Sequence, residues 1–303
     1  MSNRFYDELK NILPEERIRT DEPMKAHTTF RIGGPAKYFV IPETKEEIKE
    51  IIECCKKAKM PYYILGNGSN LLVSDKGYEG VVIQIFKNLN AIQLEGNLIL
   101  AQAGAILSSV ANKALEAGLT GFEFAAGIPG TLGGACVMNA GAYGGEMKDV
   151  LEHVVVLTEE GEFITIPKEE LELGYRTSII AKKNYVVLEA LIRLSEGDKE
   201  AIKARMDELK VQRTTKQPLE YPSAGSTFKR PEGYFAGKLI QDAGLRGFQV
   251  GGAQVSEKHC GFVINKDQAT AADVAELMRQ VSLKVKEQFG VELEAEVKRL
   301  GEF

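Results

Sequence analysis

The chain has 303 residues, which is too long for one simple core and indicates two or three domains. Its formal net charge of −5, with 44% hydrophobic and 27% charged residues, is ordinary for a globular protein and argues against nucleic acid as the main partner. We see neither the apolar core of a signal peptide nor a run long enough to span a bilayer, and therefore expect a cytoplasmic protein without membrane insertion.

The first half of the chain alternates between helical and strand-like patterns. Residues 43–61 predict a helix, because apolar side chains recur there at helical spacing. The stripe of this helix consists of Ile48, Ile51, Ile52 and Cys55. Residues 62–75 predict a strand, a tight glycine loop and a second strand. Residues 91–104 predict a hairpin that turns at Glu95-Gly96-Asn97, and residues 108–118 predict a short helix.

The second half begins with three strand-like segments, 153–157, 163–166 and 185–194. Helical spacing returns at 199–212, and a polar, turn-rich segment follows at 214–231. The predicted stripe of the first of these segments is Ile202, Met206 and Leu209. A long helix is predicted over 270–289, with the stripe Val274, Leu277, Val281, Val285 and Phe289, and a final strand over 291–300. Because no regular βαβ rhythm is present, the pattern indicates the α+β class.

Two glycine-rich segments stand out, GNGSN at 66–70 and GIPGTLGGACVMNAGAYGG at 127–145. Neither has the spacing of a P-loop or of the dinucleotide fingerprint. Glycines uncover backbone N–H groups, and such groups suit an anionic pyrophosphate. The alternative is that both segments are tight turns at sheet edges, and for 66–70 alone the two interpretations are equally well supported.

Several blocks, in order along the chain, resemble the MurB family of UDP-N-acetylenolpyruvoylglucosamine reductases. The blocks are AHTTFRIGGPA (26–36), ILGNGSNLLVSD (64–75), GFEFAAGIPGTLGGACVMNAGAYGGEM (121–147), GYRTSI (174–179), YPSAGSTFKRP (221–231), KLIQDAGLRGFQVGGAQVSEKHCGFVIN (238–265) and LEAEV (293–297). They extend from about residue 20 to the C-terminus. The short connection after Arg176 resembles the second, shorter type of the family, which lacks a tyrosine-bearing loop.

The resemblance implies an FAD-binding domain of the vanillyl-alcohol-oxidase type, built from two α+β subdomains, and a C-terminal α+β substrate domain. We expect subdomain 1 at 1–75 with 294–303, subdomain 2 at 76–200 and the substrate domain at 201–293. The segments 66–70 and 127–141 would then surround the FAD. The expected cofactor-binding residues are Gly66, Asn67, Gly68, Ser69, Asn70, Ile128, Pro129, Gly130, Thr131, Gly134, Asn139, Ala140 and Gly141.

The implied reaction is the NADPH-dependent, FAD-mediated reduction of UDP-N-acetylglucosamine enolpyruvate to UDP-N-acetylmuramate, a step in peptidoglycan precursor synthesis and thus in cell wall biogenesis. Hydride addition leaves an enolate beside the substrate carboxylate, so the site needs a cation and a proton donor. By match to the family motifs, Arg176 would hold the carboxylate and enolate. Ser226 would deliver the proton, and Glu296 would act with the arginine, in its protonated form.

Other features are weaker. Alternation over 291–300 sends Glu292, Glu294 and Glu296 to one strand face, for which a solvated face is the simpler interpretation. Lys216 matches a substrate-binding lysine of the family, and Arg213 and Lys229 are further candidates for the substrate diphosphate. Without the family context, Arg176 and Ser226 are more simply a surface ion-pair residue and a turn serine.

The four cysteines form neither a disulfide framework nor a C-x-x-C zinc pair, and we expect no metal. His259 and Cys260 lie in a strand-like context, where neighbouring side chains point to opposite faces and form no dyad. Two other functions are considered: another flavoprotein of the same fold, such as an oxidase, and a nucleotide-sugar-binding protein without catalysis. We expect a small-molecule substrate, no nucleic acid and no obligate protein partner.

Overall fold

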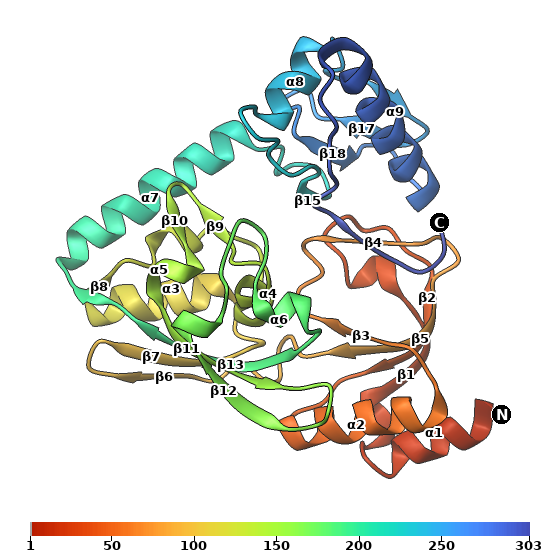
Figure 1. The fold of residues 1–303 in the computed structure, drawn as a ribbon, viewed down its shortest axis with the longest axis vertical. Helices are drawn as coiled ribbons and strands as arrows, with labels where there is room; N and C mark the ends of the chain where they lie inside the picture. Colours follow the sequence, from red (N-terminus) through yellow and green to blue (C-terminus); the bar gives the residue numbers. More distant parts are fainter. Residues whose placement is uncertain (1) are drawn as a thin grey trace. The chain divides into compact units, whose positions relative to one another are not determined.

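The computed structural model describes residues 2–303 and divides into two compact units, each with its own core. Unit 1 comprises Met1–Arg19, Phe39–Gly66 and Val81–Arg213 (Figure 1). Unit 2 comprises Thr20–Tyr38, Asn67–Gly80 and Thr214–Phe303. Four of the five divisions fall inside elements: β1 (Ile18–Pro23), β2 (Pro35–Val40), β5 (Tyr78–Gln84) and α7 (Lys199–Lys216). The fifth, between Gly66 and Asn67, falls in the loop that follows β3 (Tyr62–Leu65).

Unit 1 is built around a five-stranded antiparallel sheet of order β12-β11-β13-β7-β6. Its strands are β6 (Ile92–Glu95), β7 (Leu98–Gln102), β11 (Leu151–Leu157), β12 (Phe163–Pro167) and β13 (Val186–Arg193). The predicted hairpin at 91–104 and the three strands after it are confirmed. The helices α3 (Leu107–Ala117) and α4 (Leu132–Val137) pack on this sheet (Figure 1).

The remaining elements of unit 1 are short or lie at its edges. They are α1 (Ser2–Lys10), η1 (Glu15–Arg17), α2 (Lys45–Ala58), β3 (Tyr62–Leu65), β8 (Leu119–Thr120), η3 (Glu123–Ala125), β9 (Gly141–Ala142), β10 (Gly145–Glu146), α5 (Met147–Val150), η4 (Lys168–Glu170), α6 (Ile179–Lys182) and β14 (Ser195–Glu196). Strand β3 pairs in parallel with β5.

Helix α2 forms where the apolar periodicity predicts it. It begins at a capping box, in which Thr44 accepts a hydrogen bond from the Glu47 N–H and the Glu47 carboxylate accepts one from the Thr44 N–H. It ends at Lys59, which is left-handed with φ +53°. All four residues of the predicted stripe are buried, as is Cys54. This confirms that the cysteine pair contributes to packing.

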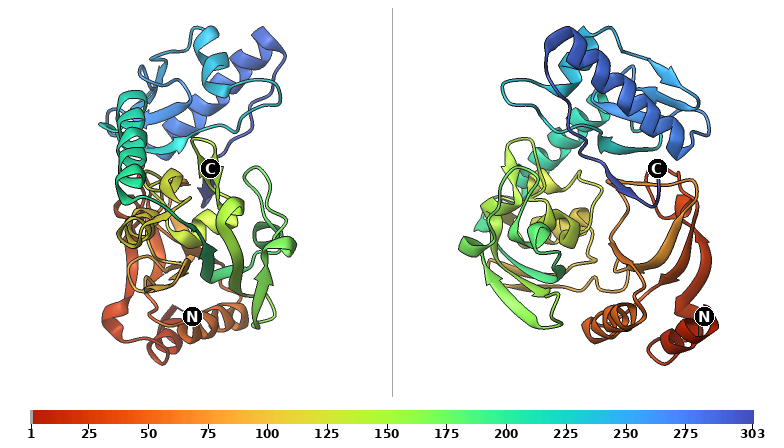
Figure 2. Two further views of the ribbon diagram at one scale, coloured as in Figure 1. Left: turned by 90° about the vertical axis from the view of Figure 1, so that its left-hand side faces the viewer. Right: turned by 45° about the vertical axis from the view of Figure 1, so that its right-hand side comes forward.

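Unit 2 has a four-stranded antiparallel sheet of order β15-β18-β17-β16, across which α9 (Ala271–Phe289) lies (Figure 2). The strands are β15 (Ser223–Ser226), β16 (Gln249–Val250), β17 (Ala253–Val255) and β18 (Phe262–Asn265). The unit also contains η2 (Met24–Ala26), β4 (Leu71–Val73), α8 (Ala236–Asp242) and β19 (Lys298–Leu300), the last paired in parallel with β4. Its core combines α9 with the sheet and with Phe30 and Leu72.

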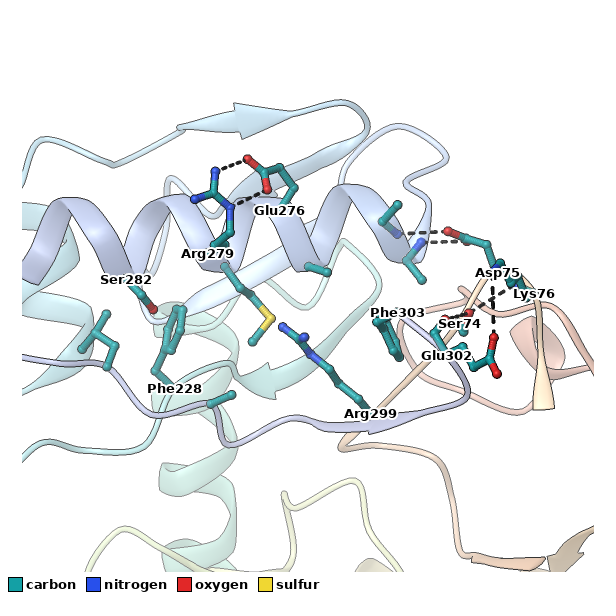
Figure 3. Close-up of a pocket in the computed structure, with 16 residues that line it drawn as sticks. Ser74, Asp75, Lys76, Phe228, Glu276, Arg279, Ser282, Arg299, Glu302 and Phe303 are labelled. Carbon is teal, nitrogen blue, oxygen red and sulfur yellow. Dashed lines mark hydrogen bonds and ion pairs between the residues drawn. The ribbon is translucent and has the colours of Figure 1, made fainter. Parts of the chain in front are cut away.

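Helix α9 is fixed firmly at its N-terminus. Thr270 and Asp273 form a capping box, and the Asp75 carboxylate accepts hydrogen bonds from the N–H groups of Ala271 and Ala272 at 2.8 and 3.0 Å (Figure 3). Burial raises the pKa of Asp273, but the hydrogen bonds from the N–H groups of Thr270 and Gly252 outweigh it, so the pKa lies below its usual value.

We expect Asp273→Asn to lower the free energy of unfolding by about 1 kcal/mol at neutral pH. The lowered pKa means that the carboxylate stabilises the fold fully above the pKa of unfolded aspartate and loses this effect as the pH falls through the lower folded value. The difference in Tm between parent and variant should therefore narrow as the pH falls from about 5 to about 2. Thermal unfolding across this range tests this, with the exposed Asp267→Asn as control; a constant difference would contradict it.

Three sequence predictions are wrong in detail. The last strand is only β19, because the chain bends at 296–297 after an isolated bridge between Phe228 and Ala295. Phe289 is 38% exposed, since it is the last residue of α9 and the buried face ends one turn earlier. Helix α7 continues to Lys216, so the start of the predicted turn-rich segment is helical.

Of the described residues, no helix has both the length and the apolar character needed to cross a membrane. The three-part division at residues 75, 200 and 293 stays a prediction.

Candidate functional site

Arg176 lies at the tip of a tight hairpin in unit 1. Gly174 and Thr177 exchange both backbone hydrogen bonds, at 3.1 and 3.3 Å, and only Tyr175 and Arg176 lie between them. Arg176 has φ +55°, a conformation that few non-glycine residues adopt. Its guanidinium lies 5.1 Å from the centre of the exposed Tyr175 ring. Arg176 therefore lies at the tip of a turn whose backbone conformation is strained.

Asn139 connects this hairpin to the glycine-rich segment. Its amide nitrogen donates to the Gly174 carbonyl at 3.1 Å and to the Glu146 carboxylate at 2.7 Å, and its amide oxygen accepts from the Lys148 N–H at 2.9 Å. The residue is 1% exposed. Because both amide hydrogens serve the protein itself, any contact of Asn139 with a cofactor must come from another of its atoms.

The glycines of this segment allow parts of the protein to approach one another closely. A Cβ at Gly133 would lie 2.9 Å from the Ala103 Cβ, and one at Gly145 would lie 2.6 Å from the Phe124 ring. The N–H groups of Leu132 and Gly133 donate to the carbonyls of Ala105 and Ala103. The expectation that the glycines leave N–H groups uncovered for a ligand is therefore wrong at Gly133, whose N–H bonds to Ala103 of the protein itself.

The two glycine-rich segments meet at Gly66 and Thr131. A Cβ at Gly66 would lie 2.6 Å from the Thr131 Oγ1, which caps α4 by accepting a hydrogen bond from the Gly134 N–H. Thr131 is 2% exposed. The sequence grouped the two segments by their glycines and by the family resemblance, and the structure brings Gly66 and Thr131 close together.

Gly68 is held against the segment that contains the HTTF block. It has φ +62°, and a Cβ there would lie 2.0 Å from the His27 carbonyl oxygen. Its own carbonyl accepts from the Thr29 N–H at 3.1 Å, and the His27 ring lies 2.7 Å from the Glu22 carboxylate. This arrangement leaves no room for a side chain.

We expect Gly68→Ala to destabilise the protein more than Gly96→Ala. The two glycines have similar positive φ values, +62° and +58°, so alanine adds about 1–2 kcal/mol of backbone strain at either. At Gly96 nothing lies within 4 Å of the new Cβ, whereas at Gly68 it meets the His27 carbonyl. Thermal unfolding of both variants measures the difference, and equal changes in Tm would show that the His27 contact does not matter.

In unit 2, Ser226 and Glu296 lie on adjoining backbone. The Glu296 N–H donates to the carbonyl of Thr227, the residue after Ser226, at 2.9 Å, and the Val297 N–H reaches the same carbonyl at 3.5 Å. Thr227 is 1% exposed, and its hydroxyl accepts from the Val263 N–H in β18 at 2.9 Å. The sequence did not single out Thr227, and only its position beside Ser226 could have drawn attention to it.

Exposure separates the three glutamates of the last segment. Glu292 and Glu294 are exposed, whereas Glu296 is 9% exposed. The expected alternation fails at Ala295, which is exposed, because two successive N–H groups share the Thr227 carbonyl and shift the register. The solvated-face interpretation therefore does not apply to Glu296.

Asn70, at the end of the 66–70 loop, is bonded to the same segment. Its amide donates to the Glu296 carbonyl at 3.2 Å, and its own carbonyl accepts from the Lys298 N–H at 3.0 Å. One turn of the glycine loop thus holds the backbone of the buried glutamate.

Comparisons with known proteins identify the family. Residues 36–167 match the FAD binding domain model, and residues 217–300 match the model of the UDP-N-acetylenolpyruvoylglucosamine reductase C-terminal domain. The chain is 56% identical, over 98% of both chains, to the protein of that name from Alkaliphilus metalliredigens. The chain belongs to the UDP-N-acetylenolpyruvoylglucosamine reductase family. The Geobacillus thermodenitrificans protein of the same name is also 56% identical, over 99% of both chains.

A solved member of this reductase family has the same fold. The MurB crystal structure from Thermus caldophilus superposes with a TM-score of 0.81 at 39% identity, covering 94% of this chain and all of that one. The α+β class, with an FAD-binding domain followed by the family's C-terminal domain, is confirmed.

One feature of α4 fits the FAD of this reductase family. Gly134 is exposed although its neighbours Gly133 and Ala135 are buried, and a Cβ there would meet only the Thr131 Oγ1, at 3.6 Å. The first turn of α4 thus has an open surface that a side chain would fill, and such a surface accepts a ligand's close approach.

The cationic residues expected at the substrate differ in their surroundings. Lys229 forms an ion pair with Glu294, and Lys216 is exposed at the end of α7. Arg213 is partly buried, which lowers its pKa, and its Cδ would lie 3.2 Å from a Cβ at Gly127. Arg213 therefore packs on the glycine-rich segment, and the charge of Lys229 is partly balanced by Glu294.

The His259–Cys260 pair lies in a turn before β18. The expectation that the two residues lie in a strand, with their side chains on opposite faces, is therefore wrong. His259 Nδ1 accepts a hydrogen bond from the Gly261 N–H, and burial raises the pKa of the Cys260 thiol. A raised thiol pKa disfavours the nucleophilic thiolate. Within residues 2–303, no three His, Cys, Asp or Glu side chains cluster as metal ligands.

A cavity of about 670 Å³ lies within unit 2, between α9 and the C-terminal segment (Figure 3). Its lining includes Arg279, Arg299 and Phe303, and Arg279 is paired with Glu276. None of the expected site residues lines it, although Phe228 and Ala295 belong to the backbone that joins Ser226 to Glu296.

Proposed function

We infer that the chain is a UDP-N-acetylenolpyruvoylglucosamine reductase, an FAD-dependent oxidoreductase that uses NADPH. The observation that carries this inference is the 56% identity over 98% of both chains to a protein of that name. The reaction forms UDP-N-acetylmuramate from UDP-N-acetylglucosamine enolpyruvate, a small-molecule substrate. We propose that it serves peptidoglycan precursor synthesis, and with it cell division, in the cytoplasm.

Bound FAD supplies hydride chemistry, as acceptor from NADPH and donor to the enolpyruvyl double bond. We propose that the residues that contact it come from the segments 66–70 and 128–141. The contact between Gly66 and Thr131 supports a joint role of the two segments, and the open surface at Gly134 supports close approach of the ligand. The side-chain amides of Asn70 and Asn139 donate to the carbonyls of Glu296 and Gly174, so these two side chains support the segments that carry Glu296 and Arg176.

The substrate accepts a hydride at its terminal carbon and a proton at the adjacent carbon. In our proposal Arg176 binds the carboxylate and the developing enolate through its planar guanidinium, and so lowers the energy of the charged intermediate. Its place at a hairpin tip, away from the regular sheet, supports a role toward a ligand.

Ser226 donates the proton and Glu296 acts beside it in this proposal. The exposure of Ser226 and the burial of Glu296, on backbone joined through Thr227, support a shared role. A serine hydroxyl is a weak acid, so a neighbouring group must stabilise its conjugate base. We assign substrate diphosphate contacts to Lys216, with Arg213 and Lys229 as further candidates.

The test is NADPH oxidation by the purified flavoprotein under nitrogen, with and without UDP-N-acetylglucosamine enolpyruvate. We expect NADPH consumption that depends on this substrate, with one equivalent of product, two hydrogens heavier, for each NADPH. Consumption only in air would favour an oxidase of the same fold. Binding of the nucleotide sugar without any consumption would favour a non-catalytic binding protein.

A further inference from the structure

The hairpin that carries Arg176 is held to the rest of unit 1 at both of its ends. On one side, the Gly174 carbonyl accepts a hydrogen bond from the Asn139 amide. On the other side, Ser178, which is fully buried, donates its hydroxyl proton to the Val137 carbonyl at 2.6 Å. Both anchors lie where α4 ends, within three residues of one another, and α4 and α6 are in contact (Figure 1).

The two anchors differ in what they control. Ser178 also accepts from the Ala181 N–H and thereby caps α6, so its bond serves a helix as well as the hairpin. The Asn139 bond reaches the hairpin itself, two residues before Arg176. It therefore acts on the strained turn directly.

Asn139 is itself fixed from several directions. Its backbone has φ +44°, a conformation that asparagine tolerates better than most residues. Its side chain makes bonds to Glu146 and Lys148 in addition to Gly174, and Glu146 also forms an ion pair with the Lys148 ammonium. A buried group with these three partners has one orientation, so its second amide hydrogen is aimed at the hairpin.

We propose that Asn139 is a positioning residue for Arg176: it locks the base of the 174–177 hairpin to the end of α4 and so holds the guanidinium where the substrate carboxylate binds. The proposal rests on the proposed function, in which Arg176 contacts the substrate. It differs from a cofactor-binding role, because the amide hydrogens of Asn139 are bonded to protein. Misplacement of a binding group by about 1 Å costs on the order of 100-fold in rate.

The test is a double-mutant cycle on the full-length flavoprotein with Asn139→Gly and Arg176→Ala. Glycine adopts the positive φ without strain, so this change removes the amide and leaves the backbone conformation. We expect Asn139→Gly to lower kcat for substrate reduction by about 100-fold, with flavin content and the rate of flavin reduction by NADPH unchanged. In the Arg176→Ala background the same change should lower kcat by less than about twofold.

The matched control is Asn184→Gly, which alters an exposed asparagine at φ +50° whose amide also donates to a carboxylate, that of Glu159. It should leave kcat unchanged.

The second variant is Asn139→Asp in a Glu146→Gln background, compared with Glu146→Gln alone. The aspartate keeps the side-chain size and the acceptor for Lys148 but has no hydrogen to give Gly174, and the glutamine removes the carboxylate 2.7 Å away that would repel it. This second variant should reproduce the loss of kcat seen with glycine.

Three results would overturn the proposal: an unchanged kcat, an equal loss with and without Arg176, or loss of bound flavin in both Asn139 variants. The last would assign Asn139 to the cofactor site or to the fold. The parent protein, assayed alongside, separates the two levels of inference. Turnover by the parent with an additive cycle would reject the positioning role alone, whereas no turnover by the parent would reject the proposed function and this inference with it.

Discussion

Ser226→Ala is expected to abolish most substrate reduction while leaving flavin reduction by NADPH intact. If Ser226 supplies the proton, its loss removes general acid catalysis, which contributes about 10²- to 10⁴-fold to rate. Ser226 is exposed at the end of β15, and alanine keeps the backbone N–H and carbonyl at this position. Loss of the hydroxyl should therefore not disturb the sheet. Stopped-flow measurement of the two half-reactions separates the effects.

Ser223→Ala is the matched control, since Ser223 lies on the same strand and is opposite Ile264 in β18. It should retain parental rates in both half-reactions. A Ser226→Ala variant with parental substrate reduction would exclude the serine as proton donor. An equal slowing of both half-reactions would instead indicate a disturbed flavin site.

The second large effect is expected at Arg176. Arg176→Ala should lower the rate of substrate reduction by about 10²- to 10³-fold, the usual cost of removing one group that stabilises a developing oxyanion. Arg176→Lys should recover little of this loss, because an ammonium cannot reproduce the two-donor fork that binds a carboxylate. Alanine and lysine at position 176 must both adopt the parent φ of +55°, so neither substitution relieves the strain of the turn.

Arg193→Ala is the control for loss of a cation. Arg193 pairs with Glu152 at the solvent-exposed end of β13, and such pairs contribute little to stability. It should keep parental kinetics and a Tm close to that of the parent. Recovery of most activity by Arg176→Lys would contradict the bidentate role and leave only a requirement for positive charge.

The sequence predicted best what depends on local periodicity. The stripe of α2 and the hairpin at Glu95-Gly96-Asn97 follow from patterns that a few residues determine. The end of the chain was harder, because the bend at 296–297 depends on hydrogen bonds to Thr227, about seventy residues earlier in the sequence. No local pattern encodes such a contact.

The glycine-rich segment shows a second limit. Its density of glycines indicated close approach of backbone to a ligand, yet Gly133 and Gly145 are required by Ala103 and Phe124 of the protein itself. A glycine in a sequence indicates that another group lies close to the backbone, but it does not show whether that group is a ligand or part of the protein. The resemblance to a family identified the cofactor, and the structure then distinguished Gly134, which faces open space, from its packed neighbours.

The two asparagines of the glycine-rich segments show a related limit. Asn70 and Asn139 lie in segments rich in glycine, where a polar side chain is readily interpreted as a ligand contact. In the structure their amides bond to the carbonyls of Glu296 and Gly174, which belong to the segments that carry two of the expected catalytic residues. From the sequence alone, an asparagine whose side chain supports a neighbouring backbone segment cannot be distinguished from one that binds a ligand.

The most direct test of the account is an anaerobic absorption spectrum of the purified protein, recorded before and after NADPH and again after UDP-N-acetylglucosamine enolpyruvate. We predict a flavin spectrum that bleaches with NADPH and returns when this substrate is added without oxygen. A protein that binds no flavin after reconstitution with FAD, or a reduced flavin that regains its colour only in air, would contradict it.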